Sequence, residues 1–359
     1  MSKEYIEKSV KFRMGKWYYL PFALNEFSWD ETINNNFVGR NWRARENEML
    51  LDHESPSSFT EQFKNFKYNL NPGLILIGKD HFEYNKFLIE FGKNAIQIPV
   101  GAHNRNSSSK DSILFPMKRS LKDVFNVHAH KDKKYNFNEK KDEIIWRGKF
   151  TGRNKNSQII YEVKDIKNNI NEFLRFKFVK KWSQKYNIKF LQDYDWNEEA
   201  HWKNVYKVGD SLQVYNKEYV DNYFRENKHM VADWIPFFDW QACHPPKVMD
   251  QYKYILSLDG HDWASNVSLI LMTNSVMISP IPKWHNIFSL DLAPWEHYVP
   301  VLDDASDFEE KLNWCKDHQN ECKDIIQRAN QYISQFTLDS EAEIAKSIIK
   351  RLYKNSKKF

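Results

Sequence analysis

Short, largely apolar runs alternate with helix-like segments along this chain, and that alternation restricts the possible folds more than any other feature. The strand candidates are Leu74–Ile77, Ala95–Val100, Asp111–Pro116, Asp142–Trp146, Tyr254–Leu258 and Ser275–Ser279. The helix candidates are 83–91, 166–185, 264–272, 304–318, 320–335 and 340–354. Short apolar runs of this kind are typical of strands buried on both faces of a parallel sheet. The sequence therefore predicts an α/β fold with parallel sheets in both halves of the chain.

The length of 359 residues favours two domains, since one domain typically takes about 150 residues. A charged, Lys-rich stretch over 128–142 is the best candidate for a linker between them. We expect a first domain over 1–135, a second over 136–335, and a final helical segment over 336–359 that packs back on the first domain. Residues 1–70 are polar and rich in Asn and aromatic side chains, and no element bounds are predicted there.

Composition excludes several classes of protein. With 41% apolar and 28% charged residues, the chain is neither fibrous nor wholly disordered. The formal net charge of 53 − 48 = +5 is taken to be spread along the chain, which suits a phosphorylated small molecule better than nucleic acid. The chain has 10 glycines, and none of the patterns GxGxxG, GxSxG, HExxH or GxxxxGK[ST] occurs.

The cysteines and the hydropathy pattern bear on metal binding and on location. The 3 cysteines imply neither a disulfide framework nor a zinc site, and a lone His128–His130 pair in the charged stretch predicts no metal. No signal peptide and no apolar window long enough to span a membrane is recognised. We therefore expect a cytoplasmic protein that could still work at the cytosolic face of a membrane.

Polar clusters follow three of the predicted strands, which is where open α/β sheets bind their ligands. The first cluster follows Asp142–Trp146 in a predicted loop, and it contains Arg147, Gly148, Lys149, Thr151 and Arg153. Its glycines allow a ligand to approach the backbone closely, and its cations and hydroxyl suit a diphosphate. The alternative is an ordinary basic surface turn.

The second cluster follows the strand Tyr254–Leu258 and contains Asp259, Gly260, His261, Asp262, Ser265 and Asn266. A helix is predicted to begin in this cluster, and its first N–H groups would face an anion. Asp259 and Asp262 are candidates either to bind sugar hydroxyls or to cap the helix. His261 is either a phosphate neighbour or an ordinary surface histidine.

The third cluster lies in the other half of the chain, where Asp80 follows Leu74–Ile77. A carboxylate at that strand end suits a general base for an acceptor hydroxyl, and a turn or cap residue is the alternative. No DxD motif stands in a convincing position at a strand end. Asp303 and Asp304 precede a predicted helix, and we interpret them as its N-cap pair.

Four motifs, in order along the C-terminal half, resemble glycosyltransferase family 90. That family includes protein O-glucosyltransferases, fungal capsule xylosyltransferases and bacterial lipopolysaccharide-modifying enzymes. The motifs are Trp146–Gly148, Tyr252–Gly260, Gly260–Asn266 and Pro294–Val301. The N-terminal half is less similar, and its Asp80 element lacks the family's Pro. Asn266 stands where the eukaryotic members carry Arg. The bacterial branch carries Asn at this position.

The resemblance implies a GT-B-like fold, in which two Rossmann-like domains with parallel sheets face a cleft. The first domain would be the acceptor side, and the second would bind the nucleotide sugar. The implied chemistry is inverting, metal-independent transfer of a hexose or pentose from a UDP-sugar to a hydroxyl of a glycan, such as lipopolysaccharide or capsule, or of a protein. Asp80 would be the catalytic base, and Trp146 with the first two clusters would bind the donor.

The resemblance implies no cofactor besides the UDP-sugar substrate and no nucleic-acid partner. One alternative from another class stays open on the residues alone. The many Trp and Tyr side chains could serve as stacking platforms in a non-catalytic carbohydrate- or nucleic-acid-binding protein.

Overall fold

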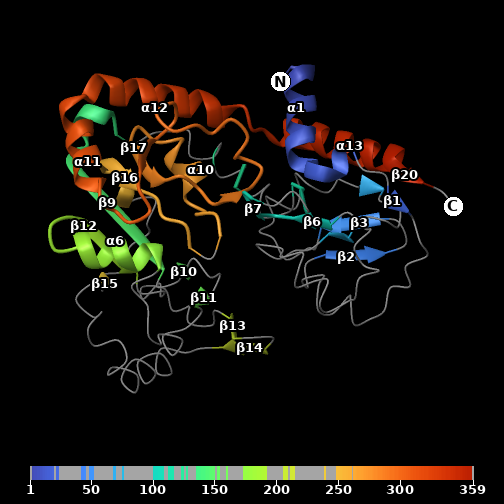
Figure 1. The fold of residues 1–359 in the computed structure, drawn as a ribbon, viewed down its shortest axis with the longest axis horizontal. Coiled ribbons are helices and arrows are strands. Elements are labelled where there is room, and N and C mark those ends of the chain that lie inside the picture. Colours follow the sequence, from blue (N-terminus) through green and yellow to red (C-terminus); the bar gives the residue numbers. More distant parts are fainter. Residues whose placement is uncertain are drawn as a thin grey trace. The chain divides into compact units, whose positions relative to one another are not determined.

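The computed structural model shows two compact units, each assembled from separate parts of the chain (Figure 1). Unit 1 comprises 1–132, 282–293 and 328–359, and unit 2 comprises 133–281 and 294–327. The residues that the structure describes are 2–19, 22–23, 42–45, 48–51, 68–69, 75–76, 100–108, 112–116, 123–124, 127, 135–149, 152–153, 159–160, 173–191, 205–208, 211–214, 238–239, 248–260 and 262–357.

Unit 2 is built on a six-stranded sheet in which all strands are parallel. Its strands are β9 (Lys141–Lys149), β12 (Asn187–Leu191), β15 (Phe238–Asp239), β16 (Tyr252–Leu256), β17 (Val276–Pro280) and β19 (Val299–Val301). The order across the sheet is β15-β12-β9-β16-β17-β19. The prediction of an α/β fold with a parallel sheet is therefore confirmed for this unit.

Both faces of this sheet are buried, as the apolar runs predicted. Ile144, Tyr254 and Ile278 alternate with Ile145, Ile255 and Met277, and all six are buried. The first three join one large cluster with side chains of helices α6 (Leu174–Trp182), α11 (Phe308–Asp317) and α12 (Gln319–Ser334). The short helix α10 (Val267–Ile270) packs against β17. Unit 2 also contains η3 (Phe137–Glu139) and the small antiparallel pairs β10 (Gly152–Arg153) with β11 (Ile159–Ile160) and β13 (Val205–Val208) with β14 (Ser211–Val214).

Unit 1 combines small sheets with two helices that are far apart in sequence. Its sheets are β5-β6-β8, which is parallel, β2-β3-β4 and β7-β18, which are antiparallel, and the pair β1-β20. Their bounds are β1 Phe22–Ala23, β2 Trp42–Arg45, β3 Glu48–Leu51, β4 Tyr68–Asn69, β5 Ile75–Leu76, β6 Val100–Ala102, β7 Arg105–Asn106, β8 Ser112–Leu114, β18 Trp284–His285 and β20 Ser356–Lys357. The helices are α1 (Lys3–Met14), which is followed by η1 (Gly15–Tyr18), and α13 (Leu338–Asn355).

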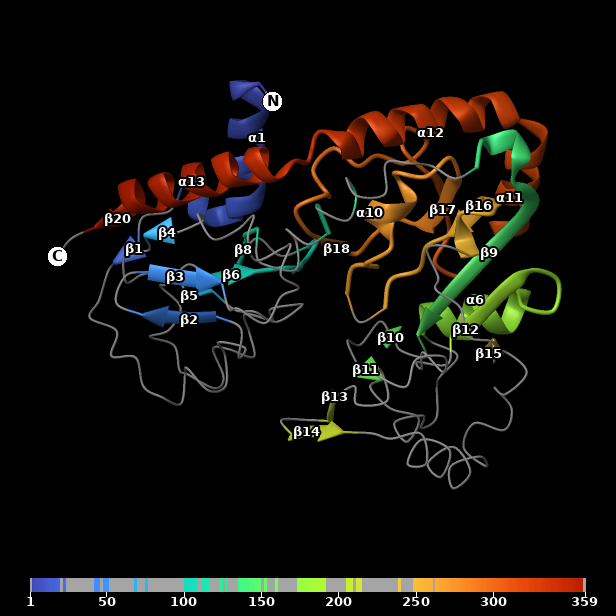
Figure 2. The same cartoon turned by 180° about the vertical axis from the view of Figure 1, so that it is seen from behind.

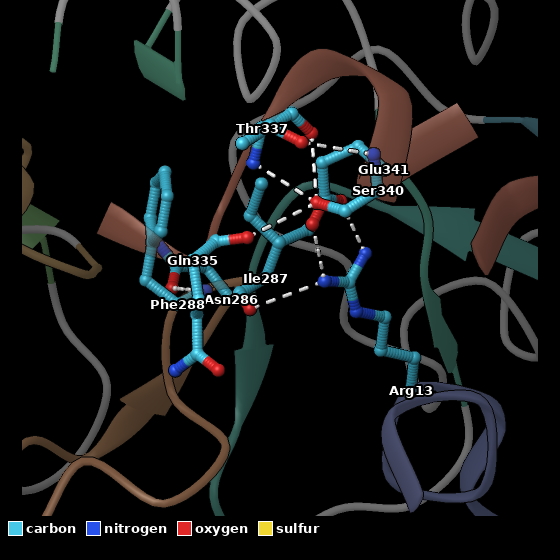
Figure 3. A network of polar contacts seen from close by, with 8 residues as sticks. All are labelled: Arg13, Asn286, Ile287, Phe288, Gln335, Thr337, Ser340 and Glu341. Carbon is cyan, nitrogen blue, oxygen red and sulfur yellow. Dashed lines mark hydrogen bonds and ion pairs between the residues drawn. The ribbon is translucent and has the colours of Figure 1, made fainter. Parts of the chain in front are cut away.

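A buried ion pair joins α1 to α13 within unit 1 (Figure 3). The Arg13 guanidinium donates to both carboxylate oxygens of Glu341 at 2.5 and 2.8 Å, and both side chains are fully buried. Arg13 also reaches the carbonyl of Ile287 at 3.4 Å. Thr337 and Ser340 exchange side-chain and backbone hydrogen bonds at 2.9 and 3.1 Å, a capping arrangement that begins α13 at Leu338.

Several predicted local features are wrong in extent. The predicted loop over 147–153 begins too early, because β9 continues through Lys149. The predicted helix 264–272 is reduced to the four residues of α10. Asp303 and Asp304 do not cap the next helix. Asp307 is its N-cap residue, and the Asp307 carboxylate accepts from the Leu302 N–H instead.

Candidate functional site

The strand order of unit 2 singles out one position on the sheet. Counted along the chain, the order β15-β12-β9-β16-β17-β19 reads 3-2-1-4-5-6, which is the order of doubly wound nucleotide-binding sheets. From β9 the chain builds outward to β12 and β15, and it then returns to build β16, β17 and β19 on the other side. The topological switch point lies between β9 and β16. In such sheets ligands bind beyond the carboxyl ends of the strands at this point.

Two of the predicted clusters meet at this switch point. β9 and β16 are direct neighbours, with Ile145 paired to Ile255 and both strands running in the same direction. Gly148 and Lys149 therefore end β9 beside the segment 257–260 that follows β16. The structure thus places the first two sequence clusters at neighbouring strand ends.

Arg175 occupies the end of β16, and sequence reasoning missed it. Its guanidinium donates to the Leu258 carbonyl, with Nε at 3.3 Å and Nη2 at 3.2 Å. It also lies 5.8 Å from the centre of the Trp146 ring. The residue comes from the first turn of α6, which has no acidic residue in that turn. A cation so close to a helix N-terminus opposes the helix dipole, but the sequence predicted a helix over 166–185 and so gave no signal for this position.

The two glycines at the switch point are required by close contacts. A Cβ on Gly260 would lie 2.7 Å from Nη2 of Arg175 and 2.9 Å from its Cζ. A Cβ on Gly148 would lie 2.3 Å from Cζ2 of the buried Trp146 indole. Gly260 therefore lets a cation lie against the backbone, and Gly148 lets the end of β9 pass over the core.

The Arg147 side chain makes hydrogen bonds away from the switch point. Its Nη1 donates to the carbonyls of Trp146 and Asn187 at 2.8 and 2.9 Å, and its Nη2 donates to Asn187 Oδ1 at 2.7 Å. Asn187 pairs with Ile145, two residues before Arg147 toward the amino end of β9. The guanidinium therefore joins β9 to the start of β12, and Arg175 is the described arginine that lies at the carboxyl edge beside Gly260.

The turn after β16 is held by its own side chains. Asp259 Oδ1 accepts from the Ala264 N–H at 3.2 Å, and the Gly260 N–H donates to the Asp262 carbonyl at 3.1 Å. Ser257 Oγ donates to Asn266 Oδ1 at 3.1 Å. Asn266 is the N-cap residue of α10, although its side chain makes no cap hydrogen bond, so Asp262 does not take the cap position.

The polar residues of this turn differ in exposure. Asp262 is buried and Ser265 is exposed. Burial and then the neighbouring Asp259 carboxylate raise the pKa of the buried Tyr298 to about 12, so that phenol stays neutral beside the turn. The turn therefore contains a buried carboxyl group and an exposed hydroxyl, and a neutral phenol lies beside it.

Some predicted site residues cannot be placed with these. Asp80, Thr151 and His261 lie outside the described residues, so their roles stay predictions. For Lys149 and Arg153 the structure describes the backbone alone, and Arg153 pairs with Ile159 in the β10-β11 hairpin.

The described residues contain neither a metal-binding group of side chains nor a membrane-spanning helix. Within them, no group of three or more His, Cys, Asp or Glu side chains is arranged to hold a metal ion. No helix in the described part of the chain has the length and apolar character needed to cross a membrane.

Comparison with known proteins gives the same family as the sequence motifs. Residues 240–343 match the sequence model of Glycosyl transferase family 90. The O-glucosyltransferase LpsA of Dichelobacter nodosus is 37% identical over 87 residues, which cover 24% of this chain and 27% of that protein. Protein O-glucosyltransferase 2 of Danio rerio is 35% identical over 82 residues, which cover 23% of this chain and 16% of that protein.

Relatives of unassigned function and a solved structure are also similar. Uncharacterized protein 179R of Invertebrate iridescent virus 6 is 39% identical over 94 residues, which cover 24% of this chain and 8% of that protein. A glycosyltransferase structure from Rickettsia africae ESF-5 aligns over 85% of this chain and 69% of its own, with 12% identity and a TM-score of 0.34.

These matches confirm the resemblance to glycosyltransferase family 90 for residues 240–343, which include β16, β17, β19 and the turn after β16. The matched segments span less than a third of the length of each of the three relatives. The comparisons support glycosyl transfer, a chemistry that requires a sugar donor and a glycan or protein acceptor.

Proposed function

We propose that this chain is a glycosyltransferase that binds the diphosphate of a UDP-sugar at the switch point of unit 2 and transfers the sugar to a hydroxyl with inversion. One observation carries the proposal. Gly148, Gly260 and the Arg175 guanidinium come together where a doubly wound sheet binds nucleotides, and the turn that contains Gly260 lies in the segment that matches family 90.

The proposed reaction is a single displacement. The acceptor oxygen attacks C1 of the sugar while the bond from C1 to the diphosphate oxygen breaks and its electron pair leaves with UDP. The acceptor proton passes to a carboxylate, for which Asp80 remains our candidate. Arg175 offsets the charge that develops on the leaving diphosphate, and a preorganised cation aimed at forming charge is a large catalytic contribution. We expect turnover without a metal ion.

For the acceptor and the cellular location, the proposal gives classes only. We propose a glycan acceptor, such as lipopolysaccharide or capsule, with a protein acceptor as the second choice, and a cytosolic place of action. The relatives named as O-glucosyltransferases support a hydroxyl acceptor. The alternative of a non-catalytic binding protein predicts carbohydrate affinity without release of UDP.

Calorimetric titration of the full chain with UDP, GDP and CMP tests the donor site. UDP should bind most tightly, and Arg175→Ala should weaken it about 10–100-fold, because hydrogen bonds to a charged group contribute about 1.5–3 kcal/mol. Arg175→Lys should recover part of the affinity, since the charge remains but the fork is lost. The matched control is Lys177→Ala, which removes a cation from the same helix. Equal UDP affinity in Arg175→Ala and in the parent chain would place the donor elsewhere.

Release of UDP from UDP-sugars tests catalysis separately. Turnover should persist in excess EDTA, and Asp80→Asn should lower it about 10²–10⁴-fold while leaving UDP affinity unchanged, as expected for loss of a general base. Loss of turnover in EDTA with recovery in manganese would overturn the metal-independent mechanism. Carbohydrate binding with no UDP release from any UDP-sugar would favour the non-catalytic alternative.

A further inference from the structure

The last residues of the chain form a basic segment. Residues 344–359 contain the six cations Lys346, Lys350, Arg351, Lys354, Lys357 and Lys358 and no acidic residue.

Three of these lysines form a row on the outer face of α13. The side of the helix that contains Glu341, Ala345, Ile348 and Leu352 is buried. Because successive residues turn by about 100° around a helix, Lys346, Lys350 and Lys354 lie on the opposite side, and all three are exposed. Within the described part of the chain, none of the three is in an ion pair.

The helix dipole does not account for this row. Cations favour the last turn of a helix because its free carbonyls are negative, and the effect fades within that turn. α13 ends at Asn355, so Lys354 fits that explanation, but Lys346 and Lys350 lie earlier in the helix. The acidic residues of α13 are confined to 338–343, which leaves the remaining length of the outer face basic.

An exposed aromatic residue lies near the C-terminal end of α13. Arg351 lies 4.3 Å from the Tyr18 ring centre, and Asn355 donates to the carbonyls of Trp17 and Tyr18 at 3.0 and 3.1 Å. These contacts fix η1 against the end of α13, and the two helices of unit 1 lie together in Figures 1 and 2. The next residue, Tyr19, is 63% exposed, with Lys11 Nζ 5.4 Å from its ring centre.

We propose that this surface, defined by Lys346, Lys350, Lys354, Lys11 and Tyr19, docks unit 1 on a membrane that carries anionic lipids. A row of lysines on a rigid helix presents several charges to one plane, and negative headgroups attract each of them. Tyrosine favours the boundary between water and lipid, because its ring is apolar and its hydroxyl is polar. The apolar side of α13 is buried in unit 1, so binding is electrostatic and reversible by salt.

Sedimentation of the full chain with lipid vesicles tests the proposal. Binding is expected to vesicles of phosphatidylcholine with about 30 mol% phosphatidylglycerol and not to vesicles of phosphatidylcholine alone. It should disappear in about 0.5 M salt. The variant Lys346→Gln/Lys350→Gln/Lys354→Gln should bind about 100-fold more weakly, from about fivefold per lysine. Tyr19→Ser should weaken binding severalfold without changing the charge.

A matched control separates the effect of this surface from the effect of net charge on vesicle binding. Lys141→Gln/Lys180→Gln/Lys323→Gln removes three exposed lysines of unit 2 and should bind nearly as well as the parent chain. Circular dichroism confirms that each variant is folded. Equal losses in the two triple variants would show that net charge alone acts and would overturn the proposal, as would binding that ignores the anionic lipid. Retention of a 30-base-pair DNA duplex in place of vesicles, lost in the α13 variant alone, would identify a nucleic-acid surface instead.

Discussion

One substitution, glycine to alanine, should have different effects at the two glycines of the switch point. At Gly260 the added methyl group would lie 2.7 Å from Nη2 of Arg175, which is the far end of a flexible side chain. Arg175 can swing away, so we expect a change in stability within about 1 kcal/mol. UDP affinity should fall about 10–100-fold, because the displaced guanidinium no longer offers its charge-assisted hydrogen bonds.

At Gly148 the methyl group would lie 2.3 Å from Cζ2 of Trp146, whose indole is buried in the core. Overpacking of this kind typically destabilises by about 1–3 kcal/mol. For a unit of this size that corresponds to a fall in melting temperature of roughly 3–9 °C, at about 3 °C for each kcal/mol.

The two variants are compared by differential scanning calorimetry and by titration with UDP at a temperature where both are folded. Gly260→Ala should change its melting temperature by no more than about 3 °C and lose UDP affinity. Gly148→Ala should instead melt at a lower temperature than the parent chain. The reasoning is refuted if Gly260→Ala binds UDP like the parent chain, or if Gly148→Ala melts at the parent temperature.

Two further predictions concern unit 1. Arg13→Met should lower the free energy of unfolding in urea by about 3–5 kcal/mol, because it leaves the buried Glu341 carboxylate without its cation. The double variant Arg13→Met/Glu341→Leu should recover most of that loss. A loss of less than about 1 kcal/mol in Arg13→Met alone would contradict this prediction. Burial, and then the charge of Arg105, lower the pKa of His285 from 6.5 to about 4, so below pH 6.5 the unfolded chain takes up a proton that the folded chain does not. Stability should therefore fall as the pH drops from 6.5 to 4, by about 1–2 kcal/mol because solvent screens the partly exposed ring. A pH profile of melting temperature unchanged by His285→Asn would refute that linkage.

Three of the six strands of unit 2, β9, β16 and β17, could be predicted because each contains a short apolar run, whereas β12, β15 and β19 were not predicted. Tyr252–Leu256 and Val276–Pro280 are buried at every position, and both lie within a residue or two of the predicted bounds. Helix α1 could not be predicted in the same way. It buries Ile6, Val10 and Met14 together with the polar Ser9 and Arg13, so its apolar stripe is interrupted by the ion pair with Glu341.

The path of the chain between β17 and β19 could not be predicted from the sequence either. Residues 282–293 belong to unit 1, where Trp284 and His285 pair with Asn106 and Arg105 in a short antiparallel ladder. A two-residue strand has no periodicity that can be recognised. Its partner lies about 180 residues earlier, so nothing local in the sequence indicates the pairing.

The position of Arg175 bears on Asn266, the position at which the resemblance to family 90 implies an arginine in eukaryotic members. The amide oxygen of Asn266 accepts from Ser257 Oγ, so its acceptor group fixes the turn after β16. A cation at the same strand end comes instead from α6, the helix that leads from β9 to β12, and it lies against Gly260. If Arg175 replaces that arginine in function, Asn266→Arg should restore UDP affinity in the Arg175→Ala background but add little to the parent chain. Affinity that rises equally in both backgrounds would show that the two positions act independently.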